Sequence, residues 1–67
     1  MNEWWGYIHT NESIQVKRYF DYLDIQEARD SPFVSRVYGP FFADSRNHAI
    51  QIVKGKDEWE MEGKYSK

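Results

Sequence analysis

The residues of this 67-residue chain that could do chemistry are two histidines and a group of four acids. His9 and His48 stand 39 positions apart and lack the paired spacing of a zinc site. The four acids recur at every third position: Asp21, Asp24, Glu27 and Asp30. Residues three apart share one face of a helix, so these carboxylates could bind a metal or exchange protons. A helix cap followed by a solvated acidic face explains the same spacing more simply.

Other catalytic patterns are missing from the sequence. There is no cysteine, none of the five serines lies in a nucleophile elbow, and no glycine-rich loop could hold a phosphate. A chain of this length also offers little concave volume for a substrate. We therefore expect a protein that is not an enzyme, with no catalytic residue, no metal and no cofactor.

Length and composition predict one small domain with an aromatic core. Because no disulfide can form without cysteine, three Trp, five Tyr and four Phe are the main source of buried surface. The net charge of −2 argues against a general electrostatic hold on nucleic acid. No apolar run has the length of a membrane span, and the first residues lack the pattern of a signal peptide, so we expect a soluble cytoplasmic protein.

The first two segments of the chain predict a β-hairpin. Residues 4–10 and 14–20 are rich in aromatic and β-branched residues and flank the turn sequence TNES. The loop length decides which side chains share a face, because a shift of one residue turns every side chain over. A two-residue loop would leave Ile8 on the polar face. We favour a loop of odd length, with Glu12 in the left-handed conformation, because it collects on one core face Trp4, Ile8, Ile14, Val16 and Phe20.

A short helix is expected after the hairpin. Asp24 followed by Glu27 resembles a capping box and predicts a helix over residues 25–30. Ser31-Pro32 would end it, because the residue before a proline is pushed out of helical space.

A third strand is expected next, over residues 34–38. Gly39-Pro40 interrupts the pattern, which indicates a bulge or an edge strand. Residues 41–43 could continue the strand beyond that interruption.

The main helix is expected near the end of the chain. Asp44 or Ser45 would cap its start and Gly55 would end it. Residues 56–67 could extend the helix, but we favour a loose tail or a short edge strand. The apolar stripe of the helix consists of Ala49, Ile50 and Val53.

The order of these elements predicts the fold class. It is a small α+β domain over residues 1–55, arranged as β-β-(short α)-β-α. A three-stranded antiparallel sheet would have one helix packed on one face, which leaves the other face without a helix.

The outer face of the hairpin is the candidate contact surface. It combines flat rings with cations, and tyrosine, tryptophan and arginine are residue types that dominate interface energies. Arg36 would join from the third strand if the register allows. The proposed partner-binding residues are Trp5, Tyr7, His9, Lys17, Tyr19 and Arg36.

Three uses of this face remain open at this stage. The rings could be covered by the C-terminal segment, with Trp59 and Met61 completing a second small core. They could contact another protein, either a host protein or a second copy of the chain. They could also stack the bases of a single-stranded nucleic acid, although the hairpin holds only two basic residues. We favour protein binding.

The opening segment WWGYIHTNES resembles that of short phage and bacterial proteins, which begin with Trp, Tyr, His and Asn at this spacing. The matching positions are Trp5, Tyr7, His9 and Asn11, while Glu12 stands where those proteins usually have glycine. The segment GPFFADSRNHAIQIV resembles their strand-to-helix ending. This resemblance implies a phage or mobile-element accessory protein in the cytoplasm of a bacterial host. There it would inhibit a bacterial defence complex, for example one of the CRISPR type.

Overall fold

The computed structural model describes the backbone of residues 1–65 and the side chains of residues 1–58. Within this part the chain forms β1 (Asn2–His9), β2 (Ile14–Arg18), α1 (Tyr22–Asp30), β3 (Val34–Ala43) and α2 (Arg46–Tyr65). The strands form an antiparallel sheet in the order β2-β1-β3. The predicted α+β class with a three-stranded antiparallel sheet is confirmed.

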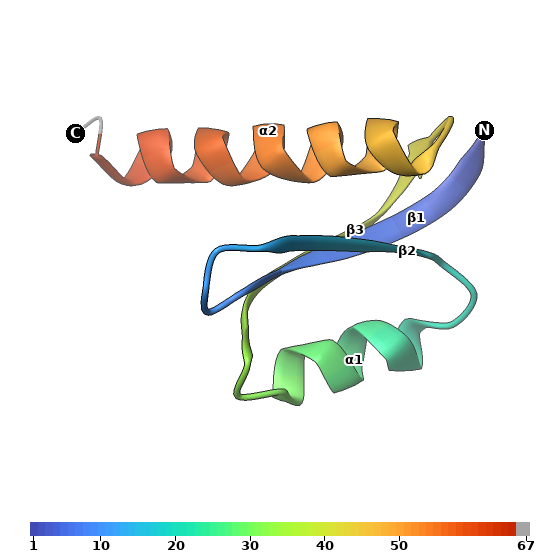
Figure 1. Cartoon of the computed structure of the whole chain (residues 1–67), viewed down its shortest axis with the longest axis horizontal. Helices are drawn as coiled ribbons and strands as arrows, with labels where there is room; N and C mark the ends of the chain where they lie inside the picture. The colour runs from blue at the N-terminus through green and yellow to red at the C-terminus, as the bar shows by residue number, and fades with distance from the viewer. Residues whose placement is uncertain (66–67) are drawn as a thin grey trace.

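The two helices lie on opposite faces of this sheet (Figure 1). The long helix α2 covers one face, as predicted. The short helix α1 covers part of the other face and packs mainly against β3. Its residue Ile25 is completely buried, which shows that α1 contributes to the interior. The hairpin face that the sequence left without a helix is therefore partly enclosed.

The hairpin has the predicted register. Ile8 pairs with Ile14, and the N–H of His9 donates to the carbonyl of Ser13 over 2.9 Å, which leaves Thr10, Asn11 and Glu12 as a three-residue loop. Glu12 has φ 71°, the left-handed conformation expected of it, and its N–H donates to the carbonyl of His9 over 2.9 Å. The odd loop length places the aliphatic residues of both strands on the α2 face.

The main core lies between the sheet and α2. Its buried residues are Ile8, Val16, Tyr38, Ala43, Ala49 and Val53, and Trp4 and Ile14 pack against them partly buried. A Cβ at Gly6 would lie 2.7 Å from a methyl of Val53, so the glycine lets α2 approach β1 closely. Phe20 was predicted in this core, which is wrong. Its ring is 79% exposed, because β2 ends at Arg18 and Phe20 belongs to the connection that follows.

The short helix begins earlier than predicted. Asp21, not Asp24, caps it: the Asp21 side chain accepts from the N–H of Leu23 over 3.0 Å. Asp24 lies in the first helical turn. The predicted end is confirmed, because Ser31 has the extended backbone that a following proline requires.

The third strand runs through Gly39-Pro40 with an irregularity. Trp4 pairs with Phe41 and Gly6 with Tyr38, so two residues of β3 stand opposite one residue of β1. This is the predicted bulge, and β3 lies at the edge of the sheet, as its proline indicates.

The long helix continues past the predicted stop. Ser45 caps the start as expected, since its hydroxyl oxygen accepts from the N–H of His48 over 3.2 Å. Gly55 does not end the helix, and residues 56–65 continue α2 in place of a loose tail or edge strand. A glycine inside a helix costs only about 1 kcal/mol. The residues that follow include Glu, Lys and Met, which favour helix.

Candidate partner-binding groove

Three aromatic rings form a row along β1. Trp5, Tyr7 and His9 point to the same face of the sheet, because side chains two apart along a strand do. The ring centroids of Trp5 and Tyr7 are 5.4 Å apart, and those of Tyr7 and His9 are 5.2 Å apart. These rings line an open groove of about 610 Å³. Its volume lies within the range of about 300–1,000 Å³ that is common for ligand sites.

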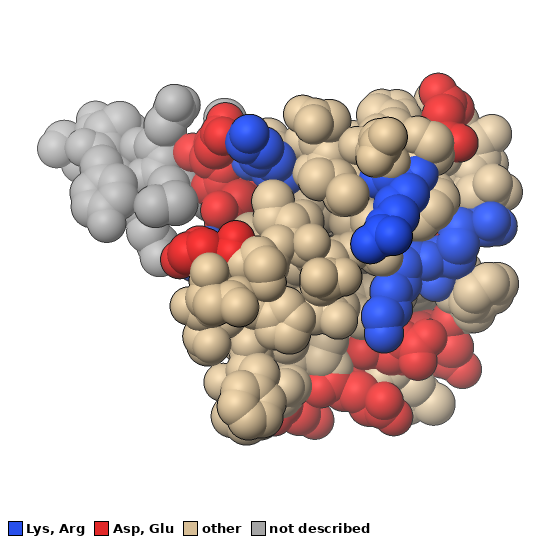
Figure 2. Space-filling model, in the orientation of Figure 1, with Lys and Arg blue, Asp and Glu red and all other residues tan. Residues whose placement is uncertain are grey.

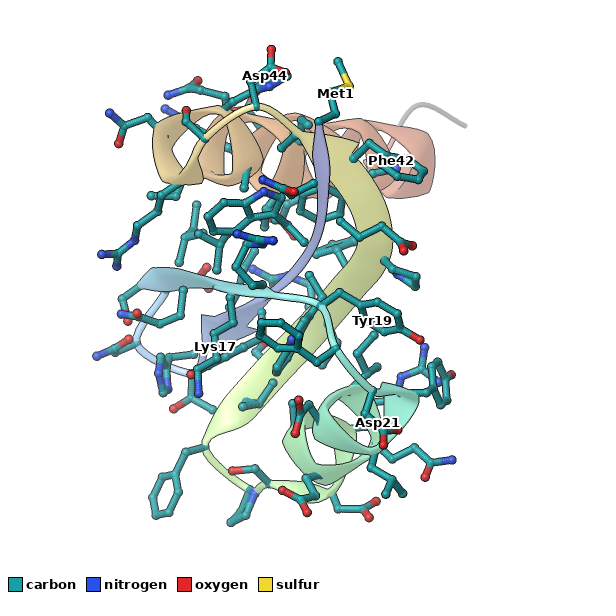
Figure 3. The ribbon with its side chains drawn as sticks, turned by 90° about the vertical axis from the view of Figure 1, so that its right-hand side faces the viewer. Met1, Lys17, Tyr19, Asp21, Phe42 and Asp44 are labelled. Atoms are coloured by element: carbon teal, nitrogen blue, oxygen red, sulfur yellow. The ribbon has the colours of Figure 1, made fainter. Side chains whose placement is uncertain are left out.

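The groove lies between α1 and the hairpin. Asp24, Glu27 and Ala28 line it from α1, and Lys17 lines it from β2. Figure 3 shows Lys17 on the α1 side of β2, with Asp21 at the start of α1 below the sheet. In Figure 2, acidic side chains (red) lie along α1, and basic side chains (blue) form a band over the neighbouring edge of the sheet. The groove thus has an acidic wall on one side and a lysine on the other.

One end of the groove is closed by hydrogen bonds to Phe33. The carbonyl of Phe33 accepts from the N–H of Thr10 over 3.0 Å and lies 3.2 Å from Nδ1 of His9. Because a carbonyl can only accept, Nδ1 must carry the proton in this contact. In the neutral ring Nε2 is then an acceptor. The bond holds the imidazole in place and ties the hairpin to the loop between α1 and β3.

The rings of the row differ in burial. Trp5 is only 3% exposed, so it belongs largely to the interior under α1. Tyr7 and His9 are half-buried, and Lys17 is exposed. The indole N–H of Trp5 is buried and has no acceptor in the described part of the chain. Trp5 therefore anchors the floor, while Tyr7, His9 and Lys17 offer the accessible surface.

The other two predicted contact residues lie outside the groove. Tyr19 follows β2, and its N–H donates to the carbonyl of Glu3 over 2.9 Å. Arg36 lies on the opposite face of the sheet, so its expected place beside Trp5 and Tyr7 is wrong. The register of β3 is the reason: Gly6 pairs with Tyr38 and Ile8 with Arg36, so Arg36 shares the face of Gly6 and Ile8, which is the α2 side.

Arg36 holds the hairpin loop to α2 instead. Its guanidinium pairs with Glu12 over 2.9 Å and with Asp57, and Asp57 also accepts from the hydroxyl of Tyr38 over 2.8 Å. Burial disfavours the charge of Arg36, but hydrogen bonds to both carboxylates outweigh it and raise its pKa above the ordinary value. The guanidinium stays charged and acts as a structural clamp.

We expect the Asp57 side of this clamp to matter more than the Glu12 side. Asp57→Ala removes a carboxylate that accepts from both Arg36 and Tyr38 and whose side chain is only 15% exposed. Its loss should cost about 1–3 kcal/mol of unfolding free energy. Glu12→Gln changes an exposed pair and should cost less than about 1 kcal/mol. Urea unfolding of both variants measures the difference, and equal losses would contradict it.

The acidic wall of the groove was not predicted from the sequence. The three-residue spacing of Asp24 and Glu27 indicated a shared helix face, but it favoured a cap and a solvated surface. Ile25 and Ala28, also three apart, were the available signal that this helix has an inward side. The side chains of Trp59 and Met61, considered as a cover for the rings, lie outside the described residues. The helix that carries them runs along the opposite face of the sheet (Figure 1).

A search for metal sites and membrane spans, and comparison with known proteins, add no further site to the described part of the chain. In the residues whose side chains are described, no group of three or more acids or histidines could hold a metal ion. No helix in the described part of the chain is long and apolar enough to cross a membrane. Comparison with protein-family models, curated proteins and solved structures finds no match.

Proposed function

We propose that this protein is a non-enzymatic binding module that holds a segment of another protein in the groove between α1 and the hairpin. The observation that supports this most directly is the row of Trp5, Tyr7 and His9 along the floor of an open groove. Aromatic side chains contribute strongly to protein interfaces, because they bury a large area with few rotatable bonds.

The walls of the groove favour a protein over a single-stranded nucleic acid. A row of rings could stack bases, but a strand also needs cations along its phosphates. Asp24 and Glu27 line the groove, and among the residues whose side chains are described Lys17 is the one lysine or arginine that does so. The two carboxylates would repel a phosphate backbone at this site.

The setting that we propose follows the resemblance of the opening residues. The protein would be a phage or mobile-element accessory protein in the bacterial cytoplasm, and its partner a component of a defence complex. This part of the proposal rests on Trp5, Tyr7, His9 and Asn11 and on the similar strand-to-helix ending.

Affinity capture with matched variants tests the proposed function. The tagged protein is incubated with bacterial lysate, with and without nuclease treatment, and bound material is compared with that held by Tyr7→Ala and Lys17→Glu. Gln51→Ala, at an exposed position of α2, is the control. We expect one protein to be retained by the parent and the control and to bind at least about tenfold more weakly to both groove variants.

The same experiment can contradict the proposal. Circular dichroism first establishes that each variant is folded. Equal capture by the folded parent and both groove variants would place binding elsewhere. Material that disappears after nuclease treatment would identify nucleic acid as the ligand, and self-association lost in Tyr7→Ala would identify a second copy.

A further inference from the structure

The charges of the groove indicate which part of a partner it accepts, an inference that rests on the proposed function. Asp24 and Glu27 bring two carboxylates to the lining, against the single ammonium of Lys17. In the described part of the chain, ion pairs join Arg36 to Glu12 and Asp57, and Nδ1 of His48 lies 3.8 Å from a carboxylate oxygen of Asp44. None involves the charged groups of the groove. The groove therefore offers two free carboxylates beside an aromatic floor.

We infer that the groove binds an arginine side chain of the partner. Its guanidinium lies flat on the accessible ring of Tyr7 and pairs with the carboxylates of Asp24 and Glu27. Aromatic faces attract cations through their quadrupole, and carboxylates accept the guanidinium N–H groups in a charge-assisted pair. Both kinds of contact are available in this groove from different elements, the rings from β1 and the acids from α1.

Arginine fits this combination better than lysine. A guanidinium is planar and weakly hydrated, so it can stack on a ring and donate to a carboxylate with its edge at the same time. An arginine of the chain already lies against aromatic rings outside the groove. The Arg18 guanidinium is 5.7 Å from the ring centroid of Trp4 and 6.0 Å from that of Phe20.

The remaining features of the groove suit an arginine within a peptide rather than a free cation. The groove is open to solvent along one side and has a volume of about 610 Å³, so a chain segment can enter with its side chain. Lys17, on the wall opposite the acids, can donate to backbone carbonyls or to an acidic neighbour of the arginine. Nε2 of His9 can accept an N–H from the segment.

A titration with two matched peptides tests the inference. The probes are N-acetyl-Gly-Arg-Gly-amide and the same peptide with citrulline, which keeps the shape of arginine but has no charge. Binding is followed by ¹H–¹⁵N correlation spectra of the full chain. The variant Asp24→Asn/Glu27→Gln removes both groove charges, and Asp30→Asn is the control, because it removes an acid of the same helix outside the groove.

We expect the arginine peptide to shift the amides of Tyr7, Lys17 and Glu27 and the indole N–H of Trp5. Citrulline should bind about tenfold more weakly, and the double variant should lose a similar factor while Asp30→Asn keeps the parent affinity. Added salt should weaken the arginine peptide more than citrulline.

Several outcomes would overturn the inference. They are equal binding of the two peptides, shifts confined to residues outside the groove, no binding of either peptide, and equal binding by the double variant. Groove shifts caused by oligothymidylate, or by raising the protein concentration alone, would assign the groove to nucleic acid or to a second copy. If lysate capture still depends on Tyr7 but not on the two acids, the arginine inference fails and the proposed function stands.

Discussion

Gly39→Ala should strongly destabilise this protein. Gly39 has φ 126°, a conformation that side chains with a Cβ rarely adopt, and strain of this kind costs about 1–3 kcal/mol. The added Cβ would also lie 2.8 Å from Cβ and 2.9 Å from Cα of Trp5. Because the contact involves backbone, it cannot be relieved by rotating a side chain. Such overpacking costs about 1–3 kcal/mol more.

The combined loss is comparable to the whole stability of a domain of this size, which is roughly 3–5 kcal/mol. We therefore expect Gly39→Ala to be largely unfolded, as measured by circular dichroism and urea denaturation. Gly55→Ala is the matched control, because a Cβ there meets nothing within 4 Å and the residue is helical. Alanine should stabilise that position by up to about 1 kcal/mol. Similar behaviour of the two variants would show that Gly39 is not constrained as described.

Ile25→Ala should also have a large effect, and it links stability to the groove. Ile25 is the buried residue of α1 and is completely enclosed. Truncating a buried isoleucine to alanine costs about 2–5 kcal/mol. A helix of nine residues is not stable without packing, so α1 should separate from the sheet and the acidic wall of the groove should be lost with it.

Two measurements check this expectation. Urea unfolding should show the stability loss, and hydrogen exchange should show faster exchange of the amides of α1 than of α2. Binding of any partner held by the groove should fall by at least about tenfold. Leu23→Ala is the matched control, since Leu23 lies on the same helix but is 59% exposed, and its truncation should cost about 0.5 kcal/mol or less. Equal losses for the two variants would contradict the placement of α1 on the sheet.

The candidate site was only partly visible in the residue pattern. Tyr7, His9 and Lys17 were predicted on one outer face, and the structure brings them together in the groove. Trp5 was predicted there as an exposed contact but is buried under α1. Arg36 was expected on this face only if the register of the third strand allowed it. The register pairs Arg36 with Ile8 and so places it on the α2 face, and no local signal in the sequence determines that pairing.

Local patterns by themselves determined the elements and the core face of the hairpin. Only an odd loop separates the aliphatic residues of β1 and β2 from the polar ones, so the register and the left-handed Glu12 followed from burial of one face. The same reasoning identified the stripe of α2, whose Ala49 and Val53 are completely buried.

Tertiary packing alone decided the rest. A nine-residue helix has little stability of its own, so its sequence does not determine where it packs. The position of α1 depends on the sheet that it contacts. The groove exists because α1 packs on β3 and leaves Tyr7 and His9 of β1 accessible beside β2, an arrangement of segments distant in sequence.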